Sequence, residues 1–229
     1  MTIRATFRPQ VLAAAAAVAA AALLTAAPAE AGGSQTMRTL RVDLAADDAT
    51  ALDLEVPVGE VRIDGTDGSR VEAAVEVRCN RPVKARCEEL ARKVELASGN
   101  SRDRLWVKLD GWPHKGNDSG LSVHLELSMP RQLALGAELG VGELEAVGLV
   151  SDMDIEIGVG EATIRAREEH VRRVDLEVGV GEATLRVGSR TIEGKGFIGR
   201  DLAWSQGTGA AALRVDCGVG EVDVRLEEE

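Results

Sequence analysis

The stretch VDLEVGVGEATLRV, residues 174–187, decides the fold, because its pattern recurs in four other segments of the chain. These copies are LDLEVPVGEVRI from Leu52, LALGAELGVGELEA from Leu133, MDIEIGVGEATIRA from Met153 and LRVDCGVGEVDVRL from Leu213. Apolar and polar residues alternate before the glycines, which is typical of a strand with one buried face. After the glycines the alternation resumes on the other parity, so an extra residue must be absorbed there. The glycines therefore predict corners where one strand becomes the next.

The spacing of the copies predicts how they assemble. The first glycine of the phrase falls at positions 140, 158, 179 and 218, in steps of 18, 21 and 39. The last step suggests a degenerate repeat around IEGKGFIGRDLAW, residues 192–204. A unit of this length cannot bury its own apolar face, so neighbouring units must stack. We interpret residues 131–229 as an all-β, flattened parallel β-solenoid with coils of 18–21 residues, stacked in chain order.

Stacking predicts columns of like residues on the outer surface. Thr163 is expected beside Thr184. Two columns are acidic: Glu161, Glu182 and Glu221 form one, and Glu156, Glu177 and Asp216 the other. Calcium-binding β-rolls place an aspartate two residues after the last glycine of the phrase. The corresponding residues here are alanine or valine and point inward, and calcium requires six to eight oxygens around it. The columns are therefore interpreted as a solvated, charged face without a metal.

The amino terminus predicts export. Two arginines, an apolar run of about sixteen residues and the small-residue segment APAEA form the pattern of a signal peptide over residues 1–31. The alternative is an uncleaved anchor, which the shortness of the run disfavours. We expect cleavage after Ala31, no transmembrane span in the mature protein, and a periplasmic or secreted location.

Composition excludes several classes of partner. Removing residues 1–31 takes two basic and one acidic side chain from 27 and 38, which leaves 25 and 37 and a net charge of −12. This acidic balance argues against nucleic-acid binding. After residue 31 only Trp106, Trp112, Trp204 and Phe197 are aromatic, so surfaces that bind glycans through aromatic faces are disfavoured.

Residues 32–130 are expected to form strands and a short helix that cap the amino-terminal end of the solenoid. RVEAAVEVRC, residues 70–79, alternates as a strand, and two more strands are expected at 104–109 and 121–128. KARCEELARKVEL, residues 84–96, has helical spacing. At the other end of the chain, the glutamates of VRLEEE are interpreted as a deterrent to edge pairing.

The cysteines are predicted to differ in chemistry. Cys79 ends a strand on its buried side, and Cys87 lies eight positions further on the inward face of the helix. In an oxidising compartment these two residues are expected to form a disulfide. Cys217 takes the inward position of Ile157 and Val178 in other copies, so it is expected to be a buried free thiol.

No catalytic, cofactor or metal site is expected. GNDSG, residues 116–120, is interpreted as a hairpin loop. His114, His124 and His170 have no partner at metal-ligand spacing. The favoured function is a non-catalytic envelope protein whose faces serve as a scaffold or interaction surface. The alternatives are an enzyme that acts on polysaccharide, by analogy with β-helix lyases, and an envelope-stress sensor subunit.

The order of motifs resembles a known family. An early G-E-V phrase in a strand, a short helix, a strand pair ending in LSMP and repeats closing on GVGEVDVRL are similar to the bacterial putative-adhesin family of unknown function, also called toastrack. The resemblance covers most of residues 38–227 as one continuous domain. It implies a β-solenoid in the cell envelope, with no established enzymatic activity, no cofactor and no catalytic residues.

Charge is distributed unevenly along the mature chain. Residues 78–108 hold nine basic and four acidic side chains, a local charge of +5. Such a sector would orient toward an anionic surface. We expect Arg86, Arg92 and Lys93 to contact an anionic envelope component: lipid head groups, a polymer or an acidic partner protein. The alternative is that they are ordinary solvated residues around a helix.

Overall fold

Strands make up most of the protein, as the all-β prediction requires. The computed structural model describes residues 33–113, 120–196 and 199–228. The predicted signal peptide and most of the predicted hairpin loop lie outside the described residues. In chain order the elements are β1 Ser34–Ala45, β2 Ala51–Thr66, β3 Arg70–Asn80, α1 Ala85–Ala91, β4 Glu95–Ser101, β5 Arg104–Asp110, β6 Leu121–Pro130, β7 Ala134–Val147, β8 Met153–Arg167, η1 Glu168–His170, β9 Val171–Val187, β10 Arg190–Glu193, β11 Arg200–Trp204 and β12 Ala211–Glu227.

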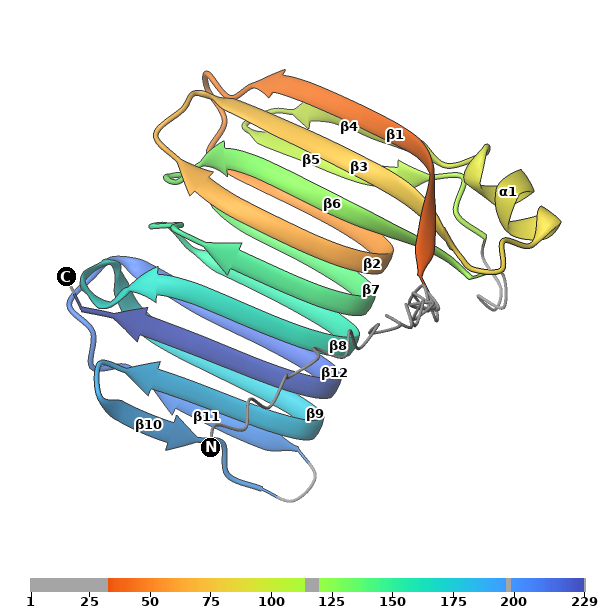
Figure 1. Cartoon of the computed structure of the whole chain (residues 1–229). Coiled ribbons are helices and arrows are strands. Elements are labelled where there is room, and N and C mark those ends of the chain that lie inside the picture. Colours follow the sequence, from red (N-terminus) through yellow and green to blue (C-terminus); the bar gives the residue numbers. More distant parts are fainter. Residues whose placement is uncertain (1–32, 114–119, 197–198, 229) are drawn as a thin grey trace, which may run out of the picture. The chain divides into compact units, whose positions relative to one another are not determined.

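Five long strands, β2, β7, β8, β12 and β9, each carry one copy of the repeat and bend at its glycines (Figure 1). The arm before the bend and the arm after it have different neighbours. The first arm of β2 pairs with β5 and its second arm with β6. Likewise, the first arm of β9 pairs with β11 and its second arm with β10. The connected sheet therefore folds back into two layers, with the apolar core between them. The first layer contains the arms before the bend, and the second layer contains the arms after it.

The stacking order of the five strands is β2, β7, β8, β12, β9, all parallel. The prediction of stacking in chain order is therefore wrong for the last copy. β12 lies between β8 and β9, so Asp223 separates Thr163 from Thr184. The carboxyl-terminal strand is thus internal, and the expectation that VRLEEE protects an edge is also wrong.

The segment between β9 and β12 explains this order. Instead of a degenerate parallel repeat, it contains β10 and β11, which pair antiparallel with the two arms of β9. These short strands occupy the side of β9 that a sequential coil would take. The last copy, β12, therefore pairs with the side of β9 that is still free, and its second neighbour is β8.

The glycine corners agree with the predicted change of parity. In β8, Ile157 before the corner and Ala162 after it are both buried. Gly160 has φ of +147°, which other residues rarely adopt. A Cβ on Gly160 would lie 1.7 Å from the carbonyl oxygen of Gly142 in β7. The strands thus approach closely at the corner, and only glycine permits this stacking.

The segment before β7 extends both layers at one end of the stack. β6, β3 and β1 continue the second layer, and β5 and β4 the first. The predicted strands at 70–79, 104–109 and 121–128 correspond to β3, β5 and β6. The predicted helix is shorter than its pattern over residues 84–96, because α1 ends at Ala91 and β4 begins at Glu95. β1 and β4 were not predicted. β2 belongs to the stack itself, because it pairs with β7 along both arms.

One arginine of β1 holds the end of α1. Arg38 Nη1 donates to the carbonyl oxygens of Arg92, at 2.7 Å, and Val94, at 2.9 Å. These bonds satisfy carbonyl groups that a helix end leaves without partners. In the described part of the chain, no helix has the length and apolar character needed to cross a membrane.

Candidate functional site

The outer face of the first layer carries a row of acidic residues. Residues on a strand alternate between the two faces, so the apolar inward positions leave charged residues outside at every second position. Each corner has a valine directly before its last glycine, and we call it the corner valine. The residue three positions before the corner valine is acidic in all five bent strands, and the parallel register aligns these acidic residues. β11 adds one more acidic residue. In order across the layer these residues are Glu55, Glu138, Glu156, Asp216, Glu177 and Asp201.

This row, named here the first acidic row, extends the predicted column of Glu156, Glu177 and Asp216 in both directions. Neighbouring strands lie about 4.8 Å apart, so like charges are held close together. The prediction named three residues of this row and missed Glu55, Glu138 and Asp201.

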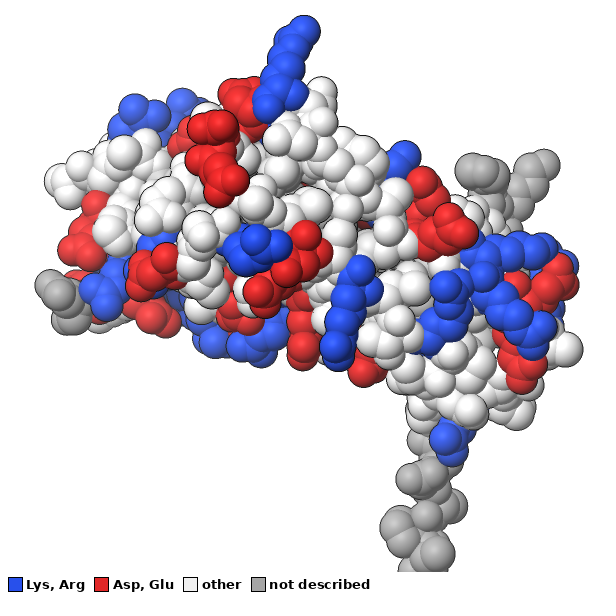
Figure 2. Space-filling model, turned by 90° about the horizontal axis from the view of Figure 1, so that it is seen from above, with Lys and Arg blue, Asp and Glu red and all other residues white. Residues whose placement is uncertain are grey.

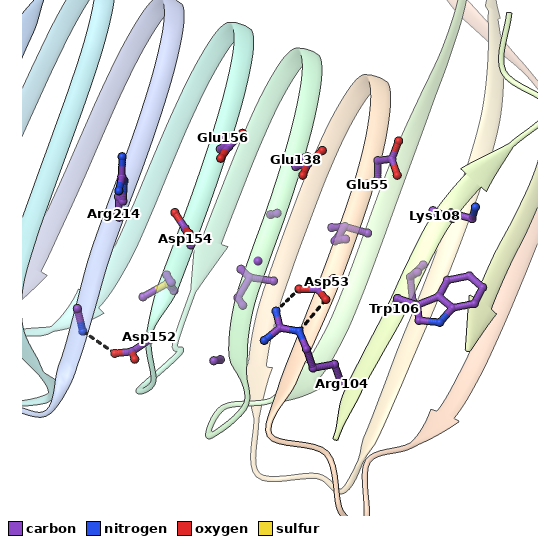
Figure 3. Close-up of a pocket in the computed structure, with 18 residues that line it drawn as sticks. Asp53, Glu55, Arg104, Trp106, Lys108, Glu138, Asp152, Asp154, Glu156 and Arg214 are labelled. Atoms are coloured by element: carbon purple, nitrogen blue, oxygen red, sulfur yellow. Dashed lines mark hydrogen bonds and ion pairs between the residues drawn. The ribbon is translucent and has the colours of Figure 1, made fainter. Parts of the chain in front are cut away.

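An open groove of about 760 Å³ crosses the same face over β5, β2, β7, β8 and β12 (Figure 3). Trp106 of β5 lies at one end of the groove, half-buried. Its indole packs over Gly99 of β4, where a Cβ would lie 2.5 Å from the ring. Lys108 holds its ammonium 5.7 Å from the centre of that ring. The charged residues that line the groove are Asp53, Glu55, Arg104, Lys108, Glu138, Asp152, Asp154, Glu156 and Arg214.

The basic residues of the groove are engaged by carboxylates. Arg104 donates two hydrogen bonds to Asp53, and these bonds are the main cause of the raised pKa of its guanidinium. Arg214 Nε donates to Asp216 Oδ2 at 2.9 Å, which likewise raises the pKa of Arg214.

The third cation, Lys108, pairs with Asp110 at 3.2 Å. Each of the three cations of the groove therefore already pairs with a carboxylate of the protein, so none of them is left unpaired to bind an anionic ligand.

Four carboxylates of the groove have no hydrogen bond or ion pair within the described residues: Glu55, Glu138, Asp154 and Glu156. Asp152 is different, because its Oδ1 accepts a hydrogen bond from the backbone of Ala212 at 2.8 Å. The groove therefore has an excess of negative charge. Among the residues that the structure describes, no group of three or more His, Cys, Asp or Glu side chains is arranged to hold a metal ion. The geometry suits an extended cationic ligand better than a single ion.

The predicted cysteine chemistry lies elsewhere in the fold. Cys79 and Cys87 are joined in a disulfide that ties β3 to α1. Cys217 is a buried free cysteine opposite Ile157 and Val178 in the register, as its position in the repeat predicts. Burial raises the pKa of its thiol.

The predicted basic sector is divided in the structure: Arg104 and Lys108 line the groove, whereas Arg86, Arg92 and Lys93 lie in or directly after α1. Arg86, Arg92 and Lys93 are exposed. Arg92 pairs with Glu88 at 3.4 Å, and Lys93 with Glu89 at 2.7 Å. Figure 2 shows basic and acidic side chains mingled at the right-hand end, where α1 lies in Figure 1. The three residues are thus exposed in or directly after α1, and glutamates of the same helix partly neutralise their charge.

His124 lies on the outer face of the second layer. Its Nδ1 is 3.1 Å from Glu60 Oε2, and its Nε2 is 3.6 Å from Glu126 Oε1. His170 lies in η1, and His114 is outside the described residues. No described histidine therefore lies in the groove.

Comparison with known proteins identifies the architecture. The family model described as the N-terminal domain of toast_rack, DUF2154, matches residues 31–186, more than half of the chain. A crystal structure of a putative cell adhesion protein from Clostridium sporogenes superposes with a TM-score of 0.54 and 15% identity, and covers 83% of this chain and 99% of that one. A putative adhesin from Bacteroides fragilis covers 82% and 97%, at 11% identity and a TM-score of 0.26. No curated protein matches the chain.

Proposed function

Because the chain belongs to the toast_rack family, we propose that it is an exported, non-catalytic cell-envelope protein that acts as an interaction module. The stacked repeats form a flattened solenoid that serves as its scaffold. The family and the fold shared with a putative cell adhesion protein support this assignment. The apolar run and small-residue segment before residue 32 support export.

The observation that carries the proposal is the groove with its unengaged carboxylates. Glu55, Glu138 and Glu156 stand one strand apart, so consecutive carboxylates are separated by about 4.8 Å. A ligand with several cationic groups about 5 Å apart satisfies more than one carboxylate at once. The ligand class is therefore a polycation, such as a polyamine or a lysine-rich segment.

Calorimetric titration of the mature protein with spermidine tests this function. We expect binding at low ionic strength that weakens at physiological salt. The double substitution Glu138→Gln with Glu156→Gln is expected to weaken binding by about tenfold or more, since hydrogen bonds to charged groups contribute roughly 1.5–3 kcal/mol each.

The matched control is Glu143→Gln with Glu161→Gln, which removes the same charge from the same two strands on the opposite face. Binding that falls equally in both variants would reflect net charge alone and would reject the groove as the site.

A second candidate function is contact with an anionic surface through the basic sector. The observation in its favour is the local charge of +5 over residues 78–108, with Arg86, Arg92 and Lys93 exposed in or directly after α1. Co-sedimentation with anionic and neutral vesicles is the test. Contact predicts salt-sensitive binding to anionic vesicles that is lost when Arg86, Arg92 and Lys93 are changed to glutamate. If the charge-reversed protein sediments like the wild type, or neither sediments, the contact does not exist.

A further inference from the structure

The bends of the five stacked strands carry an exposed apolar line. The large apolar side chains that are exposed in the described part of the chain are all corner valines: Val141 at 46%, Val159 at 47%, Val219 at 46% and Val180 at 51%. With the partly exposed Val58 they are aligned by the register, in the order Val58, Val141, Val159, Val219, Val180. We name this line the valine ridge. Four steps of about 4.8 Å give it a length of roughly 19 Å.

The fold explains the corner glycines but not the valines between them. A Cβ at Gly158 would lie 2.5 Å from the carbonyl oxygen of Gly140, and one at Gly160 would lie 1.7 Å from that of Gly142. The stack therefore requires glycine on both sides of Val159. Val159 itself points outward and half of it contacts solvent, so a threonine of the same shape fits there equally well. Contact between neighbouring valines adds little stability, because these side chains are about half exposed.

The valine ridge is flanked by acidic residues on both sides. On one side lies the first acidic row. On the other side a glutamate follows two positions after each valine, on the outer face of the second layer. In stacking order this second acidic row is Glu60, Glu143, Glu161, Glu221 and Glu182.

Only Glu60 in the second row has an ion pair within the described residues, with Arg78 at 3.6 Å and with His124. Face-to-face packing of two ridges is disfavoured, because their acidic rows would repel each other. An anionic membrane is disfavoured for the same reason.

We propose that the valine ridge binds a basic amphipathic helix of a partner protein. The length of the ridge corresponds to about 13 residues of helix at 1.5 Å per residue. Apolar residues at i, i+3, i+4 and i+7 recur every 5 Å or so along such a helix, close to the spacing of the valines. A helix about 10 Å wide matches the separation of two packed layers. Lysine or arginine side chains on both flanks of the helix then extend over the two acidic rows.

This inference goes beyond the proposed function, because the groove is lined neither by the valines nor by the second acidic row. The two sites share Glu55, Glu138 and Glu156 of the first acidic row, but each also has determinants of its own. Val141, Val159 and Val219 are specific to the ridge, whereas Trp106 and Asp154 are specific to the groove. A failure of spermidine binding therefore leaves the helix proposal untouched, and the reverse also holds.

The test uses a fluorescent 14-residue peptide of leucine and lysine, designed as a helix with one leucine stripe between two lysine flanks. Its anisotropy is measured with the mature protein, and a scrambled peptide of the same composition is the control. Changing Val141, Val159 and Val219 to threonine is expected to weaken binding by about tenfold, since each exchange removes part of a buried methyl contact. The scrambled peptide is expected to bind about tenfold more weakly than the designed one.

Thermal unfolding of the triple variant verifies that it is folded. Equal affinity of wild type and triple variant, or equal binding of both peptides, would overturn the proposal. Sedimentation of the protein without peptide tests the other possible occupant of the ridge, a second copy of this chain. A wild type that self-associates, beside a triple variant that is monomeric, would assign the ridge to a second copy of this chain instead.

Discussion

Substitution of Gly160 by alanine tests the corner stacking at its tightest point. A Cβ there would lie 1.7 Å from the carbonyl oxygen of Gly142, and every near atom belongs to the backbone of β7. The two strands must separate by about 1.3 Å to bring this contact to 3.0 Å, which stretches their hydrogen bonds beyond the normal range. One or two lost bonds cost about 1 kcal/mol each. The positive φ of 147° adds about 1–2 kcal/mol for a residue with a side chain.

Gly160→Ala is therefore expected to lower the free energy of unfolding by about 2–4 kcal/mol. Urea unfolding followed by far-ultraviolet circular dichroism measures this change. The matched control is Val159→Ala, one position earlier, where a half-exposed side chain loses two methyl groups and costs less than about 1 kcal/mol. Similar losses in the two variants would refute the close approach of the strands at the corner.

Three further predictions concern the core and the cysteines. Val178→Asp is expected to cost several kcal/mol in denaturant unfolding, because it places a charge in the core; the outward Glu177→Ala should cost less than about 0.5 kcal/mol, and equal effects would refute the alternation. Non-reducing peptide mapping should show a Cys79–Cys87 bond, whose removal costs about 2–3 kcal/mol for so short a loop; any bond to Cys217 would contradict this assignment. Cys217 should react with iodoacetamide only in denaturant, since its pKa is raised by burial; fast alkylation of the native protein would show that the thiol is exposed.

Much of the fold could be predicted from the repeats, because the sequence pattern of each repeat depends on local structure alone. Alternation and glycine placement are properties of single strands, so the inward position of Cys217 and the corner at Gly160 were predictable. The stacking order was not, because it depends on which side of β9 remains free. That choice is made by β10 and β11, which have only four and five residues, too few for a pattern to show with which strand they pair.

The candidate groove was harder to predict. The acidic residues at 156, 177 and 216 were recognisable as a column, and Glu138 could have been added to it, because it stands at the same distance before Gly140. Trp106 reaches the groove because β5 pairs with the first arm of β2, a contact between segments about fifty residues apart. β1 was not predicted, although Leu40, Val42 and Leu44 alternate with Arg41 and Asp43 as a strand requires.

The position of β12 between β8 and β9 is the central claim, since both acidic rows and the valine ridge depend on it. Cysteine pairs at outward positions test it directly. Thr163→Cys with Asp223→Cys joins register partners on adjacent strands, within the Cα separation of about 4.4–6.8 Å that a disulfide spans. Thr163→Cys with Thr184→Cys would have to bridge two strand spacings, about 9.6 Å. Under mild oxidation, peptide mapping should show a bond in the first pair and none in the second; a bond only between positions 163 and 184 would restore stacking in chain order and contradict the account.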